Sequence, residues 1–412
     1  MNCRFCDSPV QLPFVDLVNA PPSNSFLTKE QLDQPEPFFP LQVFVCESCW
    51  LVQIAEYKKF DEIFSSDYAY FSSFSTSWLE HCEAYVRFMT DRLALTVDSL
   101  VTEIASNDGY LLQYFREQGI PALGIEPTQG TASAARKKGV ETLELFWGAE
   151  TARRVSAERG QSDLMLGNNV LAHVPDINDF VEGFRIALKP QGTLTFEFPH
   201  LKNLIEFNQF DTIYHEHFSY LSLTSVQSVL AKHGLVVYDV QELPTHGGSL
   251  RVFARHADHE RLQVLPAVDA LIDHEMQAGL HEVSGYQGLQ KAADEIRSAV
   301  LEFLVGQKRA GKQVVAYGAA AKGNTLLNYC GIKGTELIRY VVDASQHKQG
   351  LYLPGSHIPV VAEERIRETR PDFVIILPWN IRAEIERQLD YVREWGAKFV
   401  TFVPDLRISE SA

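Results

Sequence analysis

Short hydrophobic runs alternate with segments of helical periodicity through the middle of the chain. Runs rich in Val, Ile, Leu and Phe that end at turn residues are typical of buried strands. Four such runs predict strands at Leu100 to Ile104, Ala122 to Ile125, Asp163 to Gly167 and Thr193 to Phe198, with helices between them. This alternation predicts an α/β fold with a doubly wound parallel sheet.

The pattern changes where this region ends. Residues 235–240 and 250–254 are hydrophobic runs with only a loop between them. We expect the two strands to pair antiparallel, because a parallel pair needs a long crossover connection. A parallel run closed by an antiparallel hairpin resembles the layout of class I methyltransferases.

A second α/β pattern lies beyond the hairpin. Residues 257–312 are predicted to be mostly helical. Strands are then predicted at Gln313 to Tyr317, Leu337 to Val342, Phe373 to Leu377 and Phe399 to Val403, with a helix from Asn380 to Glu394. The chain is therefore expected to contain two sheets of similar design.

The N-terminal portion has a different character. Pro21-Pro22 and Pro35-Glu36-Pro37 predict little regular structure before the first sheet. An aromatic stretch from Phe64 to Phe74 is most simply explained by core packing, and a helical pattern runs from Ser77 to about Leu93.

The composition is that of a globular protein larger than one core supports. Of 412 residues, 45% are hydrophobic and 22% charged, which favours two large domains or three unequal ones. The net charge of −16 argues against nonspecific nucleic-acid binding, which depends on Lys and Arg neutralising phosphates. No apolar stretch is long enough to cross a membrane, and Met1-Asn2-Cys3-Arg4 begins no signal peptide, so we expect a cytoplasmic protein without membrane contact.

Four cysteines form two Cys-x-x-Cys pairs, Cys3 with Cys6 and Cys46 with Cys49. Two such pairs place four thiolates on two turns, which a tetrahedral Zn²⁺ can join. The alternatives are disulfides, which are rare in the cytoplasm, and a redox dithiol, which needs only one pair. Four thiolates leave no open coordination position, so we predict a structural zinc ion that does not activate water.

A strand, a turn of small residues and a helix start follow one another from Val101 to Leu112. A ligand's polar group can approach the backbone of such a turn and meet the helix N-terminus. Glu126 ends the next predicted strand, where an acidic side chain typically accepts hydrogen bonds from two ribose hydroxyls.

The Gly-x-Gly-x-x-Gly fingerprint is absent from this turn, which disfavours NAD and FAD. What remains resembles the S-adenosylmethionine (SAM) site of class I methyltransferases. The predicted cofactor-binding residues are Glu103, Ala105, Asn107, Asp108, Gly109, Glu126 and Asn168. For Asn107 and Asp108 the alternative is a helix cap.

A similar strand, turn and helix start occur in the second sheet, at Gly318 to Asn324. Its backbone N–H groups and Lys322 suit a diphosphate. Asp343 ends the following strand, where it either meets the nucleoside's sugar or serves as a turn residue. His246 lies with two glycines in the predicted hairpin turn, where glycine allows close approach but is also expected in any turn.

The run Tyr214-His215-Glu216-His217 sets four titratable side chains together. Such a run can move protons, hold a metal ion, or be a chance grouping on the surface. The cysteine pairs already account for a metal, so we favour proton chemistry, for which an imidazole with a pKa near neutrality is suited.

These motifs occur in order along essentially the whole chain, which resembles the sugar-nucleotide C-methyltransferases. The motifs are the two cysteine pairs, Glu103 to Leu112, Tyr214 to Tyr220, His246 to Ser249 and Tyr317 to Asn324. Members of that family add a methyl group from SAM to C3 of a dTDP-4-keto-deoxysugar. One departure is Ala105, where the family's turn usually has glycine; alanine is expected to fit there if φ stays negative.

The resemblance implies three domains. These are a zinc-binding N-terminal domain (residues 1–65), a SAM-binding class I, Rossmann-like domain (66–255) and a second Rossmann-like α/β domain (256–412). The last begins with a helical segment and helps to hold the sugar nucleotide.

The resemblance also implies roles for individual residues. His217 is predicted to be the general base, with Glu216 orienting it or binding a sugar hydroxyl, and Tyr214 acting as a proton donor or oxyanion partner. The alternative for His217 is a structural histidine whose ring nitrogens are hydrogen-bonded within the fold. His215 is expected to point outward, away from the site. The predicted substrate-binding residues are Tyr68, which is also placed near the cofactor, His173, His246, Lys322, Asn324 and Asp343.

Other classes of function stay open on the sequence. An epimerase or dehydratase could use the same base without SAM, and measured SAM binding separates the two. A non-catalytic scaffold of one zinc module and two Rossmann-like domains would have no need for a base. A GDP- or CDP-linked ketosugar is a further alternative to the dTDP sugar.

Overall fold

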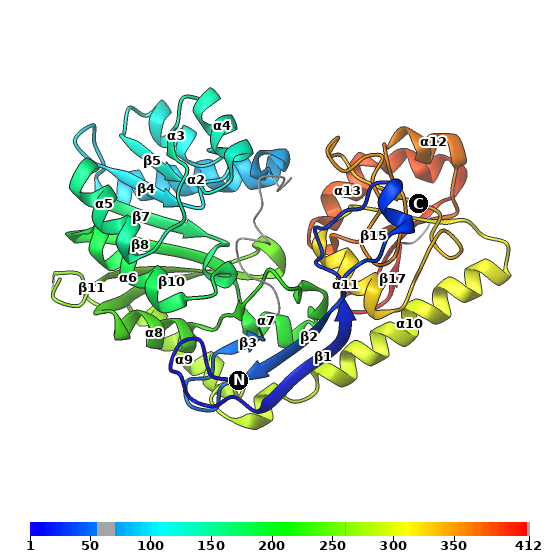
Figure 1. Ribbon diagram of the computed structural model, residues 1–412, viewed down its shortest axis with the longest axis horizontal. Helices are drawn as coiled ribbons and strands as arrows, with labels where there is room; N and C mark the ends of the chain where they lie inside the picture. The colour runs from blue at the N-terminus through cyan, green and yellow to red at the C-terminus, as the bar shows by residue number, and fades with distance from the viewer. Residues whose placement is uncertain (56–70, 260, 410–412) are drawn as a thin grey trace.

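The computed structural model describes residues 1–55, 71–259 and 261–409. Within these residues the strands form three sheets, of four, seven and six strands. In Figure 1 the seven-stranded sheet lies on the left and the six-stranded sheet on the right, with the N-terminal strands and helix α10 (Leu289–Arg309) joining them below. The predicted residue Tyr68 and most of the aromatic stretch lie outside the described residues.

The N-terminal residues form an antiparallel sheet, so the prediction of little regular structure there is wrong. Across the sheet the strands are β1 (Leu12–Ala20), β2 (Phe39–Val45), β3 (Val52–Ile54) and β9 (Ser219–Tyr220). The proline groups Pro21-Pro22 and Pro35-Glu36-Pro37 lie in the loop between β1 and β2, where they remove no ladder hydrogen bond. Val52 pairs with Tyr220 of β9, so this sheet reaches the segment that follows the run Tyr214 to His217.

The central sheet has the strand order β10-β11-β8-β7-β4-β5-β6. Its strands are β4 (Val101–Ile104), β5 (Ala122–Ile125), β6 (Glu141–Leu143), β7 (Ser162–Asn168), β8 (Leu188–Pro199), β10 (Leu235–Leu243) and β11 (Ser249–His256). The first five are parallel, and β10 and β11 pair antiparallel, both as predicted. β11 also pairs antiparallel with β8. The three-residue strand β6 was not predicted, because its run is too short to show a period.

Helices connect the strands of the central sheet, as predicted, and the first of them matches the helical pattern predicted from Ser77 to about Leu93. They are α2 (Thr76–Leu93), α3 (Leu112–Glu117), α4 (Gln129–Lys137), α5 (Ala149–Arg159), α6 (Ile177–Ala187), α7 (Leu201–Glu206), α8 (Leu223–Lys232) and α9 (Pro266–Gln277). Short 3₁₀ helices at Leu171–His173 (η3), Phe210–Thr212 (η4) and Thr245–Gly247 (η5) lie between them. Helix α2 begins where it does because the Ser75 hydroxyl accepts a hydrogen bond from the Trp78 N–H.

The C-terminal sheet has the order β14-β13-β12-β15-β16-β17 and is parallel except for β17. Its strands are β12 (Val314–Tyr317), β13 (Val341–Val342), β14 (Val360–Val361), β15 (Phe373–Ile376), β16 (Lys398–Thr401) and β17 (Arg407–Ile408). Its helices include α11 (Ala321–Tyr329), α12 (Glu364–Thr369) and α13 (Arg382–Gln388). The helix predicted from Asn380 to Glu394 is divided, with 3₁₀ turns on either side of α13.

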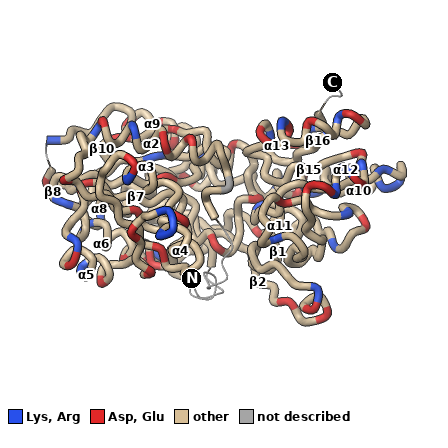
Figure 2. The backbone as a smooth tube through the Cα atoms, turned by 90° about the horizontal axis from the view of Figure 1, so that it is seen from above, with Lys and Arg blue, Asp and Glu red and all other residues tan. Residues whose placement is uncertain are grey.

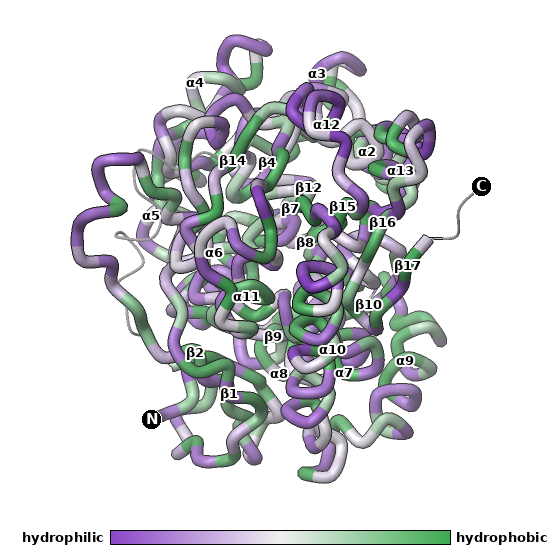
Figure 3. The backbone as a smooth tube through the Cα atoms, turned by 90° about the vertical axis from the view of Figure 1, so that its right-hand side faces the viewer, coloured by the Kyte–Doolittle hydropathy of each residue, from purple (hydrophilic) through white to green (hydrophobic). Residues whose placement is uncertain are grey.

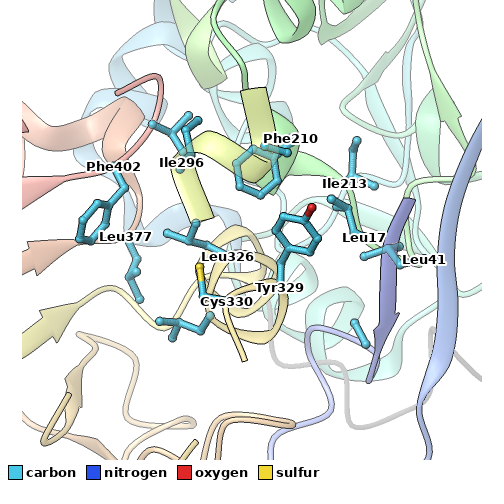
Figure 4. Packing of buried hydrophobic residues seen from close by; sticks show 14 of the residues in the cluster. Leu17, Leu41, Phe210, Ile213, Ile296, Leu326, Tyr329, Cys330, Leu377 and Phe402 are labelled. Atoms are coloured by element: carbon cyan, nitrogen blue, oxygen red, sulfur yellow. The ribbon is translucent and has the colours of Figure 1, made fainter. Parts of the chain in front are cut away.

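One hydrophobic core joins the N-terminal sheet to the C-terminal part. Leu17 and Leu41 from β1 and β2 belong to the same buried cluster as Phe210 of η4 and Tyr329 of α11 (Figure 4). Figure 3 shows the strands in green, running between the purple outer loops. Because these elements share one core, the loop before α11 has a fixed position relative to the N-terminal sheet.

The outer surface carries mixed charge. Acidic and basic residues are interspersed along the outer helices, such as α5 and α13, in Figure 2. Among the described residues no helix is both long enough and apolar enough to cross a bilayer.

Candidate active site

The four paired cysteines converge on one point. The Sγ atoms of Cys3, Cys6, Cys46 and Cys49 lie within 4.8 Å of one another. Gln53 donates a hydrogen bond of 3.2 Å to the Cys3 sulfur, which favours a thiolate there. Four thiols at this spacing fit tetrahedral zinc, so the prediction of a zinc site is confirmed. Because all four positions are taken by sulfur, the ion is structural.

Arg4 connects the zinc-binding turn to the central domain. Its backbone N–H donates to the Gln53 side chain at 2.9 Å. Its guanidinium donates to the carbonyls of Pro175 and Ile54, at 2.9 and 2.8 Å. The zinc site thus fixes a residue that bridges β3 and the loop before α6.

A cavity of about 880 Å³ lies between the central and C-terminal sheets. Its lining comes from the N-terminal segment, the turn after β4 (the cofactor turn, Ala105 to Gly109), the run Tyr214 to His217 and the loop before α11. Predicted and additional residues on its wall include Asn24, Trp78, His81, Ala105, Asn107, Glu126, Asn168, His173, Tyr214, Glu216, His217, Thr245, His246, Lys322 and Lys348. A volume of this size accommodates ligands of nucleotide size.

The cofactor turn adopts left-handed backbone at two non-glycine positions. Ala105 has φ of 56° and Asn107 has φ of 49°. A negative φ, the condition under which alanine was expected to fit at position 105, is therefore not met. The turn reverses sharply after β4, so that the Ser106 N–H donates to the Ile125 carbonyl and the Gly109 N–H to the Ser106 carbonyl. Alanine adopts this conformation at a cost of roughly 1 kcal/mol relative to glycine.

Glu126 holds the same turn from the neighbouring strand. Its carboxylate accepts the Asn107 N–H at 2.9 Å and the Thr128 N–H at 3.0 Å, and the Thr128 hydroxyl contacts it as well. Oε1 accepts both Thr128 donors, whereas Oε2 accepts the Asn107 N–H and retains acceptor capacity for a further donor. Glu126 is therefore both a support of the turn and a group on the cavity wall.

Three predicted cofactor residues lie behind the cavity wall. Glu103 is fully buried in β4, and burial raises the pKa of its carboxyl well above the usual value. Asp108 pairs with Lys138 at 3.0 Å. Gly109 has φ of 73°, and a Cβ there would meet the Ala135 Cβ at 3.2 Å, so both the turn and the packing require glycine. The structure thus brings Ala105, Asn107, Glu126 and Asn168 to the cavity and leaves these three in support of the turn.

His217 has a defined tautomer. Its Nδ1 lies 2.8 Å from the Thr212 carbonyl oxygen. A carbonyl only accepts, so Nδ1 carries the hydrogen and Nε2 of the neutral ring holds the lone pair. Burial, and then the nearby His173, lower the pKa of His217 well below its usual value. The ring is therefore neutral near pH 7 and can accept a proton at Nε2.

Aromatic side chains surround this imidazole. The Tyr214 ring centroid lies 4.0 Å from that of His217, and the His173 ring lies 4.6 Å from it, edge to face. Burial lowers the pKa of His173 to about 4, so this ring is also neutral near pH 7. The three predicted residues therefore form one cluster on the cavity wall.

The two remaining residues of the run diverge. Glu216 is buried and accepts hydrogen bonds of 2.8 Å at both carboxylate oxygens from the Asn24 side-chain amide. His215 lies away from the cavity, as expected, but it is buried rather than outward-facing. Its side chain points away from the cavity, and its Nε2 donates to the Pro40 carbonyl at 3.1 Å.

Lys322 extends from α11 to the cavity. Its Nζ donates to the Asn380 side chain at 2.7 Å and lies 4.6 Å from the centre of the Trp379 ring. Burial lowers the pKa of Lys322, and the Asp211 carboxylate opposes this effect. Lys348, which the sequence did not indicate, lines the same wall and donates to the Ala319 carbonyl at 2.9 Å.

Two predicted substrate residues are engaged elsewhere. Asn324 is buried and donates to the Ser23 carbonyl at 2.7 Å, away from the cavity wall. Asp343 accepts the backbone N–H groups of Ala319 and Ser345, each at 2.8 Å. Asp343 thus supports its turn as Glu126 supports the cofactor turn, which agrees with the alternative of a turn residue.

A buried polar cluster beside His246 was missed by the sequence analysis. Glu197 of β8 accepts hydrogen bonds of 2.9 Å from both Arg251 and Thr245, and His81 lies 2.9 Å from it. Trp78 stacks on His81. The sequence did contain one indication of this cluster: Glu197 lies inside an otherwise hydrophobic strand, and a buried carboxylate requires a polar partner.

Comparisons with known proteins agree with this arrangement. Residues 3–64 match a model described as a zinc binding domain, residues 79–240 a methyltransferase domain, and residues 244–404 a C-methyltransferase C-terminal domain. The chain is 36% identical to the C-methyltransferase NovU of Streptomyces niveus over 409 residues, covering 99% of this chain and 96% of that protein. The chain belongs to the sugar C-methyltransferase family. It is a SAM-dependent C-methyltransferase with a four-cysteine zinc site.

Two similar solved structures each cover less than half of this chain. The PH0226 protein of Pyrococcus horikoshii OT3 is 16% identical, covers 48% of this chain and 99% of its own, and has a TM-score of 0.38. Magnesium protoporphyrin IX methyltransferase of Synechocystis PCC 6803 is 13% identical, covers 43% and 78%, and has a TM-score of 0.33. The family assignment rests on the full-length relative and not on these structures.

Proposed function

We propose that the chain transfers a methyl group from SAM to C3 of a nucleotide-linked 4-keto-deoxysugar, with dTDP as the nucleotide. The observation that carries the proposal is His217, whose Nδ1 is held by Thr212 and which lines the same cavity as the cofactor turn. A carbon beside a ketone becomes nucleophilic only after it loses a proton. A base and a methyl donor in one cavity meet that requirement.

In this proposal His217 is the general base. Its Nε2 takes the proton as the C3–H bond breaks, and the electron pair moves through the C3–C4 bond to the ketone oxygen, giving an enolate. When bound, SAM supplies the electrophilic methyl group, to which C3 bonds as the methyl–sulfur bond breaks. The Tyr214 phenol, beside the His217 ring, donates a hydrogen bond to the enolate oxygen.

In this proposal the diphosphate of the substrate lies on the cavity wall formed by the C-terminal part. Lys322, with the backbone N–H groups that open α11, suits the diphosphate. Glu216, His173 and His246 contact the sugar, and Asn107, Glu126 and Asn168 contact SAM. We divide the chain accordingly into residues 1–65 for zinc, 66–255 for SAM and 256–412 for the nucleotide.

Isotope exchange tests the proposal. The enzyme is incubated with a dTDP-4-keto-deoxysugar in deuterated water, first without SAM and then with it. Deuterium is expected at C3 in the first step and the mass of a methyl group in the second. The GDP- and CDP-linked ketosugars are run beside it and are expected to react poorly. If no nucleotide-linked ketosugar gains a methyl group, the substrate class is wrong; if SAM is consumed without prior exchange at C3, the enolate step is wrong.

A further inference from the structure

The segment between β1 and β2, residues 21–38, crosses from the N-terminal sheet to the C-terminal part. We call it the strap. In Figure 1 it is the blue loop that lies against the C-terminal sheet and its helices. Leu27 exchanges two backbone hydrogen bonds with Tyr352, at 2.9 and 2.8 Å. Glu36 accepts hydrogen bonds of 2.8 Å from the Gly355 N–H and the His357 ring.

The strap is also fastened close to the cavity. Asn324 of α11 is 1% exposed, and its Nδ2 donates to the Ser23 carbonyl at 2.7 Å. The next residue, Asn24, lines the cavity. The position of Asn24 is therefore set by a buried side chain of the C-terminal part, 301 residues away from Ser23 along the chain.

The Asn24 amide meets the carboxylate of the catalytic run. Its Nδ2 lies 2.8 Å from both Oε1 and Oε2 of Glu216. One donor shared between two oxygens fixes the rotation of the carboxylate plane as well as its position. Asn24 brings no charge, so it satisfies a buried carboxylate without the neutralisation that a Lys or Arg would produce.

We propose that Asn24 is a positioning residue that holds the Glu216 carboxylate in its catalytic orientation, and that Asn324 sets Asn24 in place through Ser23. This inference rests on the proposed function for the role of Glu216, and on the hydrogen bonds of Asn24 and Asn324 for its geometry. It ties the C-terminal part to a carboxylate of the central domain. Loss of either amide therefore releases Glu216 without removing any group that touches the reacting atoms.

A double-mutant cycle on methyl transfer tests the role. Asn24→Ala is expected to lower kcat about tenfold with KM changed less than about threefold, because orientation and not substrate affinity is lost. Asn324→Ala is expected to act in the same direction. In a Glu216→Ala background, Asn24→Ala is expected to have less than about a twofold further effect. Ser25→Ala, an exposed neighbour in the strap, is the matched control and keeps wild-type kcat and KM.

Two outcomes of this cycle overturn the proposal. Equal effects of Asn24→Ala in both backgrounds would make Asn24 independent of Glu216. A rise in KM alone would make it a direct substrate contact. SAM binding by each variant confirms that the central domain is folded.

A second measurement does not depend on the substrate. Asn24→Asp places a carboxylate against Glu216, so its melting temperature is expected to lie below that of the wild type at about pH 8. Adding Glu216→Gln is expected to restore the lost stability, because Gln again pairs with Asp. No restoration means that the contact does not exist. If the wild type methylates no sugar nucleotide, the proposed function fails while this measurement still decides the contact.

Discussion

The indole Nε1 of Trp379 lies 2.8 Å from Oδ2 of Asp211. This hydrogen bond joins the C-terminal part to η4, the turn whose Thr212 carbonyl holds His217. Asp211 is 1% exposed, and the Lys322 ammonium is its nearby counter-charge. The turn that supports His217 is thus positioned by a charge and an indole from the opposite side of the cavity.

Asp211 is expected to make stability depend on pH. Burial raises the pKa of Asp211 to about 6, against the opposing effects of Lys322 and Trp379. Because the folded-state pKa is raised, its contribution to stability is full below the ordinary value near 3.8 and is lost as pH rises through about 6. Asp211→Asn has no carboxyl group to titrate, so its stability does not fall for this reason as the pH rises. Relative to the wild type, its unfolding free energy should rise by about 3 kcal/mol between about pH 4 and pH 7.

Denaturant unfolding across this pH range measures the Asp211 effect. Asp33→Asn, an exposed substitution in the strap, is the control for general effects of charge. A constant difference between Asp211→Asn and the wild type at all pH values would show that Asp211 titrates normally.

His217→Asn is expected to remove both steps of the reaction. The asparagine amide can still donate to the Thr212 carbonyl, but no lone pair remains at the position of Nε2. Exchange at C3 and methyl transfer should fall by a factor of about 10² to 10⁴. Because the pKa of His217 is lowered, the acid limb of kcat/KM attributable to it should lie below the usual imidazole value. Exchange that persists in His217→Asn would exclude it as the base.

Ala105→Gly is expected to stabilise the protein. Glycine removes the left-handed strain at φ of 56° but adds freedom to the unfolded chain, which leaves a gain of about 0.5 to 1 kcal/mol. Ala94→Gly is the matched control, since Ala94 ends α2 with φ of 49° away from the cavity wall. Both variants should melt higher than the wild type, whereas only Ala105→Gly should alter SAM affinity. A lower melting temperature for both would mean that neither alanine is strained.

Zinc removal is expected to unfold the N-terminal sheet. One zinc ion should be bound per chain, and Cys6→Ser should reduce metal content and lower the melting temperature. Methyl transfer should fall too, because Arg4 then no longer fixes the loop before α6. Cys330→Ala, a buried cysteine outside the cluster, should keep its zinc. Full metal content in Cys6→Ser would contradict the four-sulfur site.

Local pattern predicted the elements better than it predicted the site. Strands β4 and β5 and the hairpin of β10 and β11 were identified because burial and turn residues leave a short-range signal. The N-terminal sheet was missed because prolines were interpreted as breaking structure, while they occupy only the loop between two strands. The positive φ of Ala105 was not predicted, since the path of this turn depends on where the next strand places Glu126, which accepts the Asn107 N–H.

Partners across the fold were beyond the reach of the sequence. Asn24 and Glu216 are 192 residues apart, and no motif in the sequence around either residue indicates that they are in contact. Asn324 and Asp343 were predicted from their chemistry to contact a ligand, and the fold brings their polar atoms to Ser23, Ala319 and Ser345. A buried polar side chain forms its hydrogen bond with the group that packing places within reach, and the sequence alone does not show which group that is.

The sequence by itself determined the zinc site, the two α/β sheets, the cofactor turn and the run Tyr214 to His217, because each is a spacing or period within a few residues. Only the tertiary structure decided which nitrogen of His217 holds the lone pair, and which residues support the cofactor turn rather than line the cavity. It also decided that the strap, fastened to α11, brings Asn24 to Glu216. These are decided by contacts between distant segments, which form when one shared core fixes the elements against one another.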